Sequence, residues 1–204
     1  MKLQNLFSIF PGIPENAFSH VEVTDICYDA RKATPGSVFV AIRGSKADGH
    51  DFISDSIANG ASALVVENRE RVPHDFKGFV LQVPNSRQVL DLLASRFYYD
   101  PGRDLFCIGI TGTNGKTSIS YMLECILESA NMPTGVIGTV NHRLGDKIWP
   151  TEMTTPDPVN LQKRLHEFHN EGASAVVMEV SSHALQQKRV DSVPFNAVVF
   201  TNLT

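Results

Sequence analysis

Short apolar runs rich in β-branched residues alternate with amphipathic stretches along the whole chain. This alternation is typical of α/β proteins, in which helices pack on a mostly parallel sheet. In the first half of the sequence, three apolar runs are predicted to be strands and two amphipathic stretches are predicted to be helices. The predicted strands are 37–42, 62–67 and 78–83, and the predicted helices are 51–59 and 86–98.

A second group of elements follows residues 98–104, YYDPGRD, where Asp-Pro-Gly breaks both helix and strand. We therefore expect two domains, 1–102 and 103–204. The second is predicted to contain a hairpin that turns at Gly145-Asp146, strands at 105–110, 135–140, 175–180 and 197–202, and helices at 116–130 and 158–171. The runs at 175–180 and 197–202 are continuous and apolar, as expected of parallel strands that are covered on both faces.

The sequence stops just after the last predicted strand. A doubly wound sheet continues from each strand into a helix that returns the chain, and here no helix follows. We therefore expect this chain to be a truncated part of a longer protein.

The composition is that of a soluble globular protein, with 42% apolar and 20% charged residues. A formal net charge of −4 gives no general attraction to nucleic acid, so none is expected as a partner. No apolar run approaches the roughly 20 residues that span a bilayer, and the N-terminus lacks the apolar core of a signal peptide. The three cysteines are far apart and in no ligand spacing, which indicates buried thiols in a reducing compartment, and we expect the cytoplasm.

The loop GITGTNGKTS, residues 109–118, lies between a predicted strand and a predicted helix. The common phosphate-loop pattern needs a glycine five positions before the Gly-Lys-Thr, but that position is Ile110. Gly112 and Gly115 still allow positive φ, and the following helix N-terminus would face an anion. The loop therefore predicts nucleotide-phosphate binding, with Lys116 at the β- and γ-phosphates and the Thr117 hydroxyl at Mg²⁺. The alternative is a plain strand-to-helix turn with a solvated lysine.

These features together predict an α/β fold. We expect a small N-terminal α/β domain, followed by the first part of a P-loop ATPase domain with a mostly parallel sheet.

Glu179 is predicted to end a strand beside this loop, where a carboxylate can hold Mg²⁺; the alternative is an ordinary strand-end glutamate. The Ser181-Ser182-His183 run that follows does not indicate a serine hydrolase. Consecutive residues do not assemble a catalytic triad, and no Gly-x-Ser-x-Gly motif surrounds them.

Other polar residues leave two interpretations open. Thr154 and Thr155 could bind phosphate or sugar, or could form a capped turn before the next helix. Arg189 could clamp an anion, although an isolated arginine is usually solvated. In the first half, a group of polar residues near strand ends is as compatible with ion pairs and turns as with a binding site: Asp29, Arg31, Lys46, Asp48 and His50.

Together these stretches resemble the Mur ligases, and within that family the UDP-N-acetylmuramoyl-tripeptide synthetase type. The resemblance covers nearly the whole chain, through YDARKATPGSVFVAIRGSKADGHDFI, GITGTNGKTS, TTPD, MEVSSHALQQKRV and VVFTNLT. The family's ATP loops carry the same Thr-Asn-Gly-Lys-Thr form, which accounts for the unusual spacing. The SSHAL, RV and FTNL segments distinguish this branch from other Mur ligases and from folylpolyglutamate synthetases.

The resemblance implies an ATP- and Mg²⁺-dependent amide ligase of peptidoglycan synthesis, monomeric and without membrane insertion. ATP would phosphorylate the terminal carboxylate of UDP-MurNAc-L-Ala-D-Glu, and a diamino acid would attack the acyl phosphate. In the family, a modified metal-binding lysine, the adenine site and the domain that selects the diamino acid follow the FTNL segment. The isolated chain is therefore expected to have little or no ligase activity.

The resemblance also implies roles for individual residues. Lys116 would be catalytic, and the ATP phosphates would be held by Gly112, Thr113, Asn114, Gly115, Lys116 and Thr117. Mg²⁺ would be held by Thr117 and Glu179. The sugar-peptide would be contacted by Thr154, Thr155, Ser181, Gln187 and Arg189, and its uridine-diphosphate end by Tyr28, Ala30, Ser45, Lys46 and Ala47. The family often has serine where this chain has Ala30, which removes a hydroxyl from the expected uridine site.

Two alternatives remain at the level of sequence. One is a different Mur-type ligase, such as the enzyme that adds D-Ala-D-Ala. The other is a non-catalytic module that binds UDP-MurNAc peptides.

Overall fold

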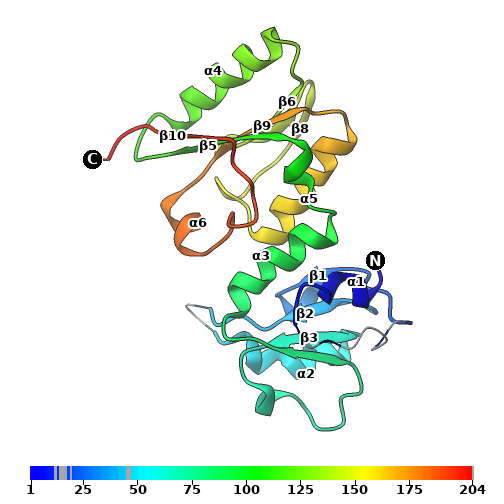
Figure 1. Ribbon diagram of the computed structural model, residues 1–204. Helices are drawn as coiled ribbons and strands as arrows, with labels where there is room; N and C mark the ends of the chain where they lie inside the picture. The colour runs from blue at the N-terminus through cyan, green and yellow to red at the C-terminus, as the bar shows by residue number, and fades with distance from the viewer. Residues whose placement is uncertain (12, 14–17, 19, 45–46, 204) are drawn as a thin grey trace. The chain divides into compact units, whose positions relative to one another are not determined.

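The computed structural model describes residues 1–11, 13, 18, 20–44 and 47–203. Contacts between Cα atoms divide the chain into two compact units, Met1–Phe97 and Tyr98–Thr204 (Figure 1). The domains expected at 1–102 and 103–204 stay a prediction. Every helix in the described ranges is too short or too polar to cross a bilayer.

The first unit is built on a four-stranded parallel sheet in the order β1-β2-β3-β4. Its strands are β1 (Ile26–Cys27), β2 (Val38–Val40), β3 (Ala63–Val66) and β4 (Phe79–Gln82). Its α-helices are α1 (Leu3–Phe7), α2 (Ile53–Ala58) and α3 (Ser86–Phe97), and its 3₁₀ turns are Ala30–Lys32, Gly49–Phe52 and Arg69–Arg71.

Alternation along the strands distributes side chains to both faces of this sheet. Phe39 and Leu64 pack with Ile53 of α2 in one buried cluster. Val38 and Val40 are fully buried as well and point to the opposite face, which α3 covers. The three predicted strands and the two predicted helices of this unit are therefore present, whereas the short elements α1 and β1 were not predicted.

The second unit has a six-stranded sheet in the order β10-β5-β9-β6-β7-β8. The first four strands in that order are parallel, and β7 and β8 form an antiparallel hairpin. The strands are β5 (Phe106–Thr111), β6 (Thr134–Ile137), β7 (His142–Leu144), β8 (Lys147–Trp149), β9 (Ala175–Glu179) and β10 (Ala197–Phe200). The helices are α4 (Lys116–Ser129), α5 (Pro158–Asn170) and α6 (Ser182–Gln186), with a 3₁₀ turn at Pro101–Asp104.

Two helices cover opposite faces of this sheet (Figure 1). The α5 face buries Leu161, Leu165 and Phe168 against strand residues such as Ile137 and Met178. The α4 face is a smaller cluster, formed by strand residues and by the partly buried side chains of Ile119, Leu123 and Leu127. The α/β fold class and the parallel sheet agree with the sequence prediction.

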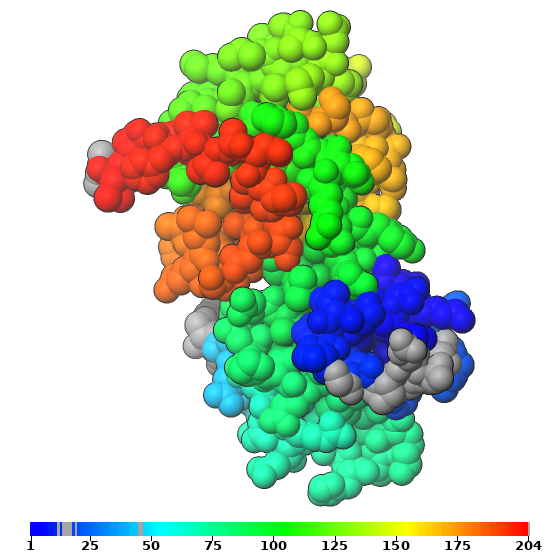
Figure 2. All heavy atoms as spheres, viewed as in Figure 1, coloured from blue at the N-terminus to red at the C-terminus, as the bar shows by residue number. Residues whose placement is uncertain are grey.

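The prediction that 197–202 is covered on both faces is wrong. Ala197 and Val199 pack against the α4-side cluster, but Val198 and Phe200 are 66% and 63% exposed. The strand lies at the edge of the sheet, and Figure 2 shows the C-terminal residues, in red, on the surface of the second unit. A continuous apolar run thus forms a parallel strand that only one layer of the described residues covers.

The strand expected at 135–140 ends early, at Ile137. Gly138, Thr139 and Val140 leave the sheet, and a hydrogen bond from the Gly138 N–H to the Asn141 carbonyl closes the turn. This departure from the predicted strand brings Thr139 to the candidate site.

Candidate functional site

The loop between β5 and α4 has the strand–loop–helix form that the sequence predicts. Gly112 and Gly115 lie at φ values of +132° and +87°, in a region that side chains disfavour. Helix α4 begins at Lys116, directly after Gly115. The first N–H groups of a helix have no partner within the helix, so this end of α4 can bind an anion.

Thr201 and Asn202, which directly follow β10, form hydrogen bonds with the loop. The Thr113 N–H donates to the Asn202 carbonyl at 3.0 Å, and the Asn114 N–H donates to Asn202 Oδ1 at 3.0 Å. The Thr201 hydroxyl donates to the Asn114 carbonyl at 2.6 Å. The N–H groups of Thr113 and Asn114 are therefore used within the protein. We expect an anion to be bound mainly by the N–H groups at the start of α4.

Lys116 folds back over this loop. Its ammonium group donates to the carbonyls of Gly112 at 2.6 Å and Thr113 at 3.1 Å. The lysine is half-buried and not freely solvated. The Lys116 ammonium group therefore lies at the loop, where it can also contact an anion bound at the N-terminus of α4.

Glu179 ends β9 and is only 1% exposed. Its Oε2 accepts hydrogen bonds from the hydroxyls of Thr117 at 3.0 Å and Thr139 at 2.9 Å. Its Oε1 accepts the Thr139 N–H at 3.1 Å. The structure thus brings together the two residues predicted to bind Mg²⁺, because parallel strands β5 and β9 end at the same edge of the sheet.

The oxygen atoms at this point suit Mg²⁺, which prefers carboxylate and other hard oxygen ligands. Thr117 and Glu179 supply a hydroxyl and a carboxylate in direct contact. Among the described residues, no group of three or more His, Cys, Asp or Glu side chains could enclose a metal. A cation here would need further oxygen ligands, and Mg²⁺ usually takes them from phosphate and water.

The hydroxyls of the two predicted threonines differ in environment. Thr155 is 1% exposed, donates to the Glu179 carbonyl at 2.9 Å and accepts the Ser181 N–H at 3.0 Å. Thr154 is half-buried and lies 3.1 Å from the Thr139 hydroxyl. The turn before α5 is also capped, because Asp157 Oδ1 accepts from the N–H groups at the start of the helix.

Arg189 is not an isolated surface arginine. Its Nη1 donates to the Thr155 carbonyl at 2.8 Å, and its Nη2 donates to Gln187 Oε1 at 2.7 Å. Ser181 caps α6 by accepting the Ala184 N–H at 3.2 Å. The predicted sugar-peptide residues of the second unit are therefore joined by hydrogen bonds around the Thr155 segment, next to Glu179.

In the first unit, the predicted uridine residues lie near the ends of short elements. Tyr28 is 40% exposed, Ala30 is buried at the start of a 3₁₀ turn, and Ala47 is exposed. Ser45 and Lys46 lie outside the described residues.

The charged residues near these positions form ion pairs and turns. Arg31 donates two hydrogen bonds from its guanidinium to the Asp29 carboxylate, and this contact lowers the pKa of Asp29 and raises the pKa of Arg31. His50 is buried, with Nδ1 2.6 Å from Asp48 Oδ1, while its Nε2 accepts the Glu67 N–H at 2.9 Å. The Nε2 acceptor role fixes the proton on Nδ1, which therefore donates to Asp48 Oδ1.

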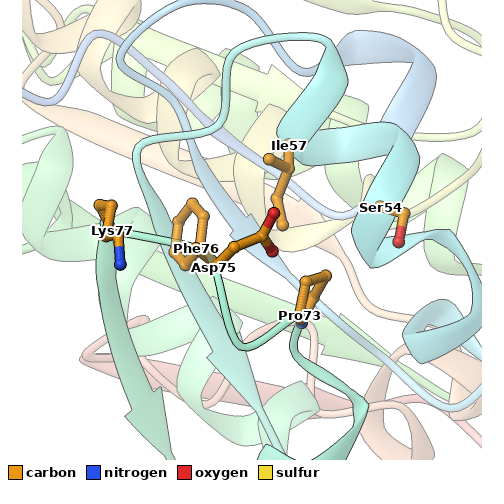
Figure 3. Close-up of a pocket in the computed structure, with 6 residues that line it drawn as sticks. All are labelled: Ser54, Ile57, Pro73, Asp75, Phe76 and Lys77. Atoms are coloured by element: carbon orange, nitrogen blue, oxygen red, sulfur yellow. The ribbon is translucent and has the colours of Figure 1, made fainter.

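A pocket of about 420 Å³ opens elsewhere in the first unit, between α2 and residues 73–77 (Figure 3). None of the predicted site residues lines it. Its wall consists of Ser54, Ile57, Pro73, Asp75, Phe76 and Lys77.

Sequence reasoning missed three residues of the candidate site. Thr139 was placed inside a strand, although a threonine after a glycine at a strand end could have suggested a turn. Thr201 and Asn202 were noted as part of a family segment, but no contact with the loop was expected.

Both halves of the chain match known families. Residues 22–98 match the model described as "Mur ligase family, catalytic domain", and residues 110–204 match "Mur ligase middle domain". Two relatives, each named UDP-N-acetylmuramoyl-L-alanyl-D-glutamate--2,6-diaminopimelate ligase, come from Caldanaerobacter subterraneus and Geobacter sulfurreducens. They are 45% and 41% identical over 91% and 100% of this chain, which spans 38% and 40% of their lengths.

Solved structures of Mur ligases also resemble this chain. A structure of a ligase with that same name superimposes with a TM-score of 0.82 at 27% identity, over 100% of this chain and 41% of the other. The MurF ligase from Thermotoga maritima, solved in complex with ADP, has a TM-score of 0.59 at 24% identity, over 89% of this chain and 38% of the other. At that identity the second likeness indicates the fold alone.

Proposed function

Because this chain belongs to the Mur ligase family, we propose that the full-length protein is an ATP-dependent amide ligase of peptidoglycan synthesis. It would join 2,6-diaminopimelate, the amino acid in the relatives' names, to UDP-MurNAc-L-Ala-D-Glu. The observation that carries the proposal is the contact between the Thr117 hydroxyl and the buried Glu179 carboxylate beside a glycine loop. This pairing is what a site for Mg²⁺ and nucleotide phosphates needs.

The chemistry requires activation of a carboxylate, because its oxygen is a poor leaving group. Transfer of the γ-phosphoryl group of ATP to the terminal carboxylate gives an acyl phosphate. The amine of the incoming amino acid then attacks the acyl carbon, loses a proton and expels inorganic phosphate. The enzyme's part is to align the reactants and to offset the negative charge of the transferring group.

The loop residues Gly112 to Thr117 would hold the phosphates. The glycines allow the close approach of the chain, and the N-terminus of α4 directs its N–H groups at the anion. Lys116 would exchange its bonds to the Gly112 and Thr113 carbonyls for the β- and γ-phosphate oxygens. The positive charge of Lys116 would then stabilise the negative charge that develops on the phosphate oxygens during transfer.

Thr117 and Glu179 would hold Mg²⁺ through the hydroxyl and carboxylate oxygens that already face each other. The bound ion supplies positive charge to the phosphoryl oxygens. Glu179 suits this role because it is buried and held by hydrogen bonds, so its orientation is fixed before the nucleotide arrives.

The sugar-peptide would bind at two places. Thr154, Thr155, Ser181, Gln187 and Arg189 would contact the reacting peptide end, because their hydrogen-bonded group adjoins Glu179. Tyr28, Ala30, Ser45, Lys46 and Ala47 of the first unit would contact the uridine-diphosphate end. The proposal includes a monomer in the cytoplasm, where free thiols such as those of the three cysteines persist.

The test is phosphate release by the full-length protein from ATP and Mg²⁺. We expect turnover that requires both UDP-MurNAc-L-Ala-D-Glu and 2,6-diaminopimelate, with formation of the amide product confirmed by mass spectrometry. Lys116→Ala should abolish it, whereas Lys163→Ala, at an exposed lysine of α5, should not.

Other outcomes would assign a different function. Turnover that ignores the sugar-peptide would contradict the proposal. Turnover only with D-Ala-D-Ala and the tripeptide nucleotide would indicate the other Mur-type ligase. Tight binding of the sugar-peptide without ATP affinity would indicate a non-catalytic module.

A further inference from the structure

Thr139 contacts both oxygens of the Glu179 carboxylate. Its hydroxyl donates to Oε2 at 2.9 Å, and its N–H donates to Oε1 at 3.1 Å. The same hydroxyl lies 3.1 Å from that of Thr154. A single residue therefore fixes the rotation of the carboxylate and links it to a neighbouring threonine.

The turn that carries Thr139 is shaped for this approach. A Cβ atom at Gly138 would overlap Glu179 Oε1, so a larger residue there would force the carboxylate to move from its present position. The turn is closed between Gly138 and Asn141, and Asn141 Oδ1 accepts a hydrogen bond from Arg143 at 3.0 Å. Arg143 is in turn bound to Glu124 of α4. The turn is thus tied to the helix that starts at the loop.

The directions of the hydroxyl protons follow from the acceptor. A carboxylate only accepts, so Thr117 and Thr139 both give their single proton to Glu179 Oε2. Thr139 has then no proton left for Thr154, and Thr154 must donate to it. The result is a directed chain from Thr154 through Thr139 to Glu179.

We propose that Thr139 is a positioning residue that keeps Glu179 aimed at Thr117 and couples it to Thr154. When the Thr117 oxygen and Glu179 serve a cation, the two bonds from Thr139 keep the carboxylate from turning away. The proposal rests on the proposed function for its cation and nucleotide, and it adds Thr139 to the residues of that site.

The test compares three variants of the full-length protein. Thr139→Val removes the hydroxyl but keeps the shape and the N–H group. Thr139→Ser keeps the hydroxyl. Thr151→Val is the matched control, because among the residues that the structure describes the Thr151 hydroxyl bonds within its own turn, to Met153.

The readout is Mn²⁺ binding in the presence of a non-hydrolysable ATP analogue, followed by electron paramagnetic resonance. Loss of a hydrogen bond to a charged group should weaken Mn²⁺ binding about ten-fold in Thr139→Val. Thr139→Ser and Thr151→Val should bind like the wild type. Unfolding in urea should show that all three variants remain folded under the assay conditions.

Several results would overturn the proposal. Unchanged Mn²⁺ affinity in Thr139→Val would show that the hydroxyl does not position Glu179. Equal loss in Thr139→Ser would assign the effect to side-chain volume, and wild-type protein that binds no Mn²⁺ would remove the cation itself. The ligase function is tested separately, since this titration needs no sugar-peptide: protein that binds Mn²⁺ as expected but forms no amide would contradict the ligase function and leave the role of Thr139 standing.

Discussion

The substitution of Gly112 by alanine tests how far the loop between β5 and α4 depends on Thr201 and Asn202, which follow β10. Gly115, three residues further in the same loop, is the matched control. Both glycines have positive φ, but their surroundings differ. A Cβ atom at Gly112 would overlap Thr201 Oγ1 and would lie 2.9 Å from the Asn202 carbonyl oxygen, whereas at Gly115 it would meet nothing within 4 Å.

The expected magnitudes follow from these surroundings. Alanine at positive φ costs about 1–2 kcal/mol from backbone strain, and both variants incur that cost. Gly112→Ala adds an overlap with the Thr201 hydroxyl and a close approach to the Asn202 backbone, which follows directly on β10, and overpacking of this kind costs about 1–3 kcal/mol more. We therefore expect Gly112→Ala to lower the free energy of unfolding by about 2–5 kcal/mol and Gly115→Ala by about 1–2 kcal/mol.

The assay is urea unfolding followed by tryptophan fluorescence. The chain has one tryptophan, Trp149, whose ring packs against Phe168 at 5.7 Å between centroids, so its fluorescence reports on the second unit. Unchanged m-values would show that the variants differ in stability and not in the unfolded state. Equal destabilisation by the two substitutions, or a larger effect at Gly115, would refute the reasoning.

Three further predictions concern other parts of the two units. Burial, with the charge of Arg164, lowers the pKa of His142 to about 4, so the folded state binds fewer protons than the unfolded state below about pH 6.5. The contribution of the neutral, buried His142 to the free energy of unfolding is complete above pH 6.5 and is lost as the pH falls towards 4, by up to about 3 kcal/mol. His142→Phe should flatten the measured dependence of the free energy of unfolding on pH. Arg143→Ala should lower the free energy of unfolding by about 3 kcal/mol, because it leaves the mostly buried Glu124 carboxylate unpaired, and the double variant with Glu124→Leu should recover part of the loss in urea unfolding. Cys125 is exposed, so the sequence prediction of three buried thiols is wrong for it, and iodoacetamide should modify it first. Peptide mapping should show the two buried cysteines protected until the chain unfolds; burial raises the pKa of each of those thiols to about 11.

The parts of the site that sequence predicted are the parts that local rules determine. A strand, two glycines and Lys116 follow one another in the chain, so the loop needs no distant information. Glu179 was placed beside Thr117 because the carboxyl ends of neighbouring parallel strands share an edge. The fold class was predicted for the same reason, since periodicity within each segment distinguishes strands from helices.

The parts that sequence did not predict depend on distant contacts. GVIGTV, residues 135–140, has the composition of one strand, but Thr139 leaves the sheet and bonds to the Glu179 carboxylate, 40 residues further on. The exposure of Val198 and Phe200 could not be inferred either, because an apolar run does not say how many layers cover it. The roles of Thr201 and Asn202 require knowing that β10 pairs with β5.

The hydrogen bonds between Asn202 and the loop before α4 have a consequence for the timing of folding. Asn114 and Asn202 are 88 residues apart, and β5, which is synthesised before β9 and β10, lies between them in the sheet. Contacts of such sequence separation form late, because the intervening chain must first be ordered. During synthesis, the loop would therefore remain without its final shape until the ribosome has released residue 202. The contacts of the loop with Thr201 and Asn202 would then form in a single late step, once β10 pairs with β5.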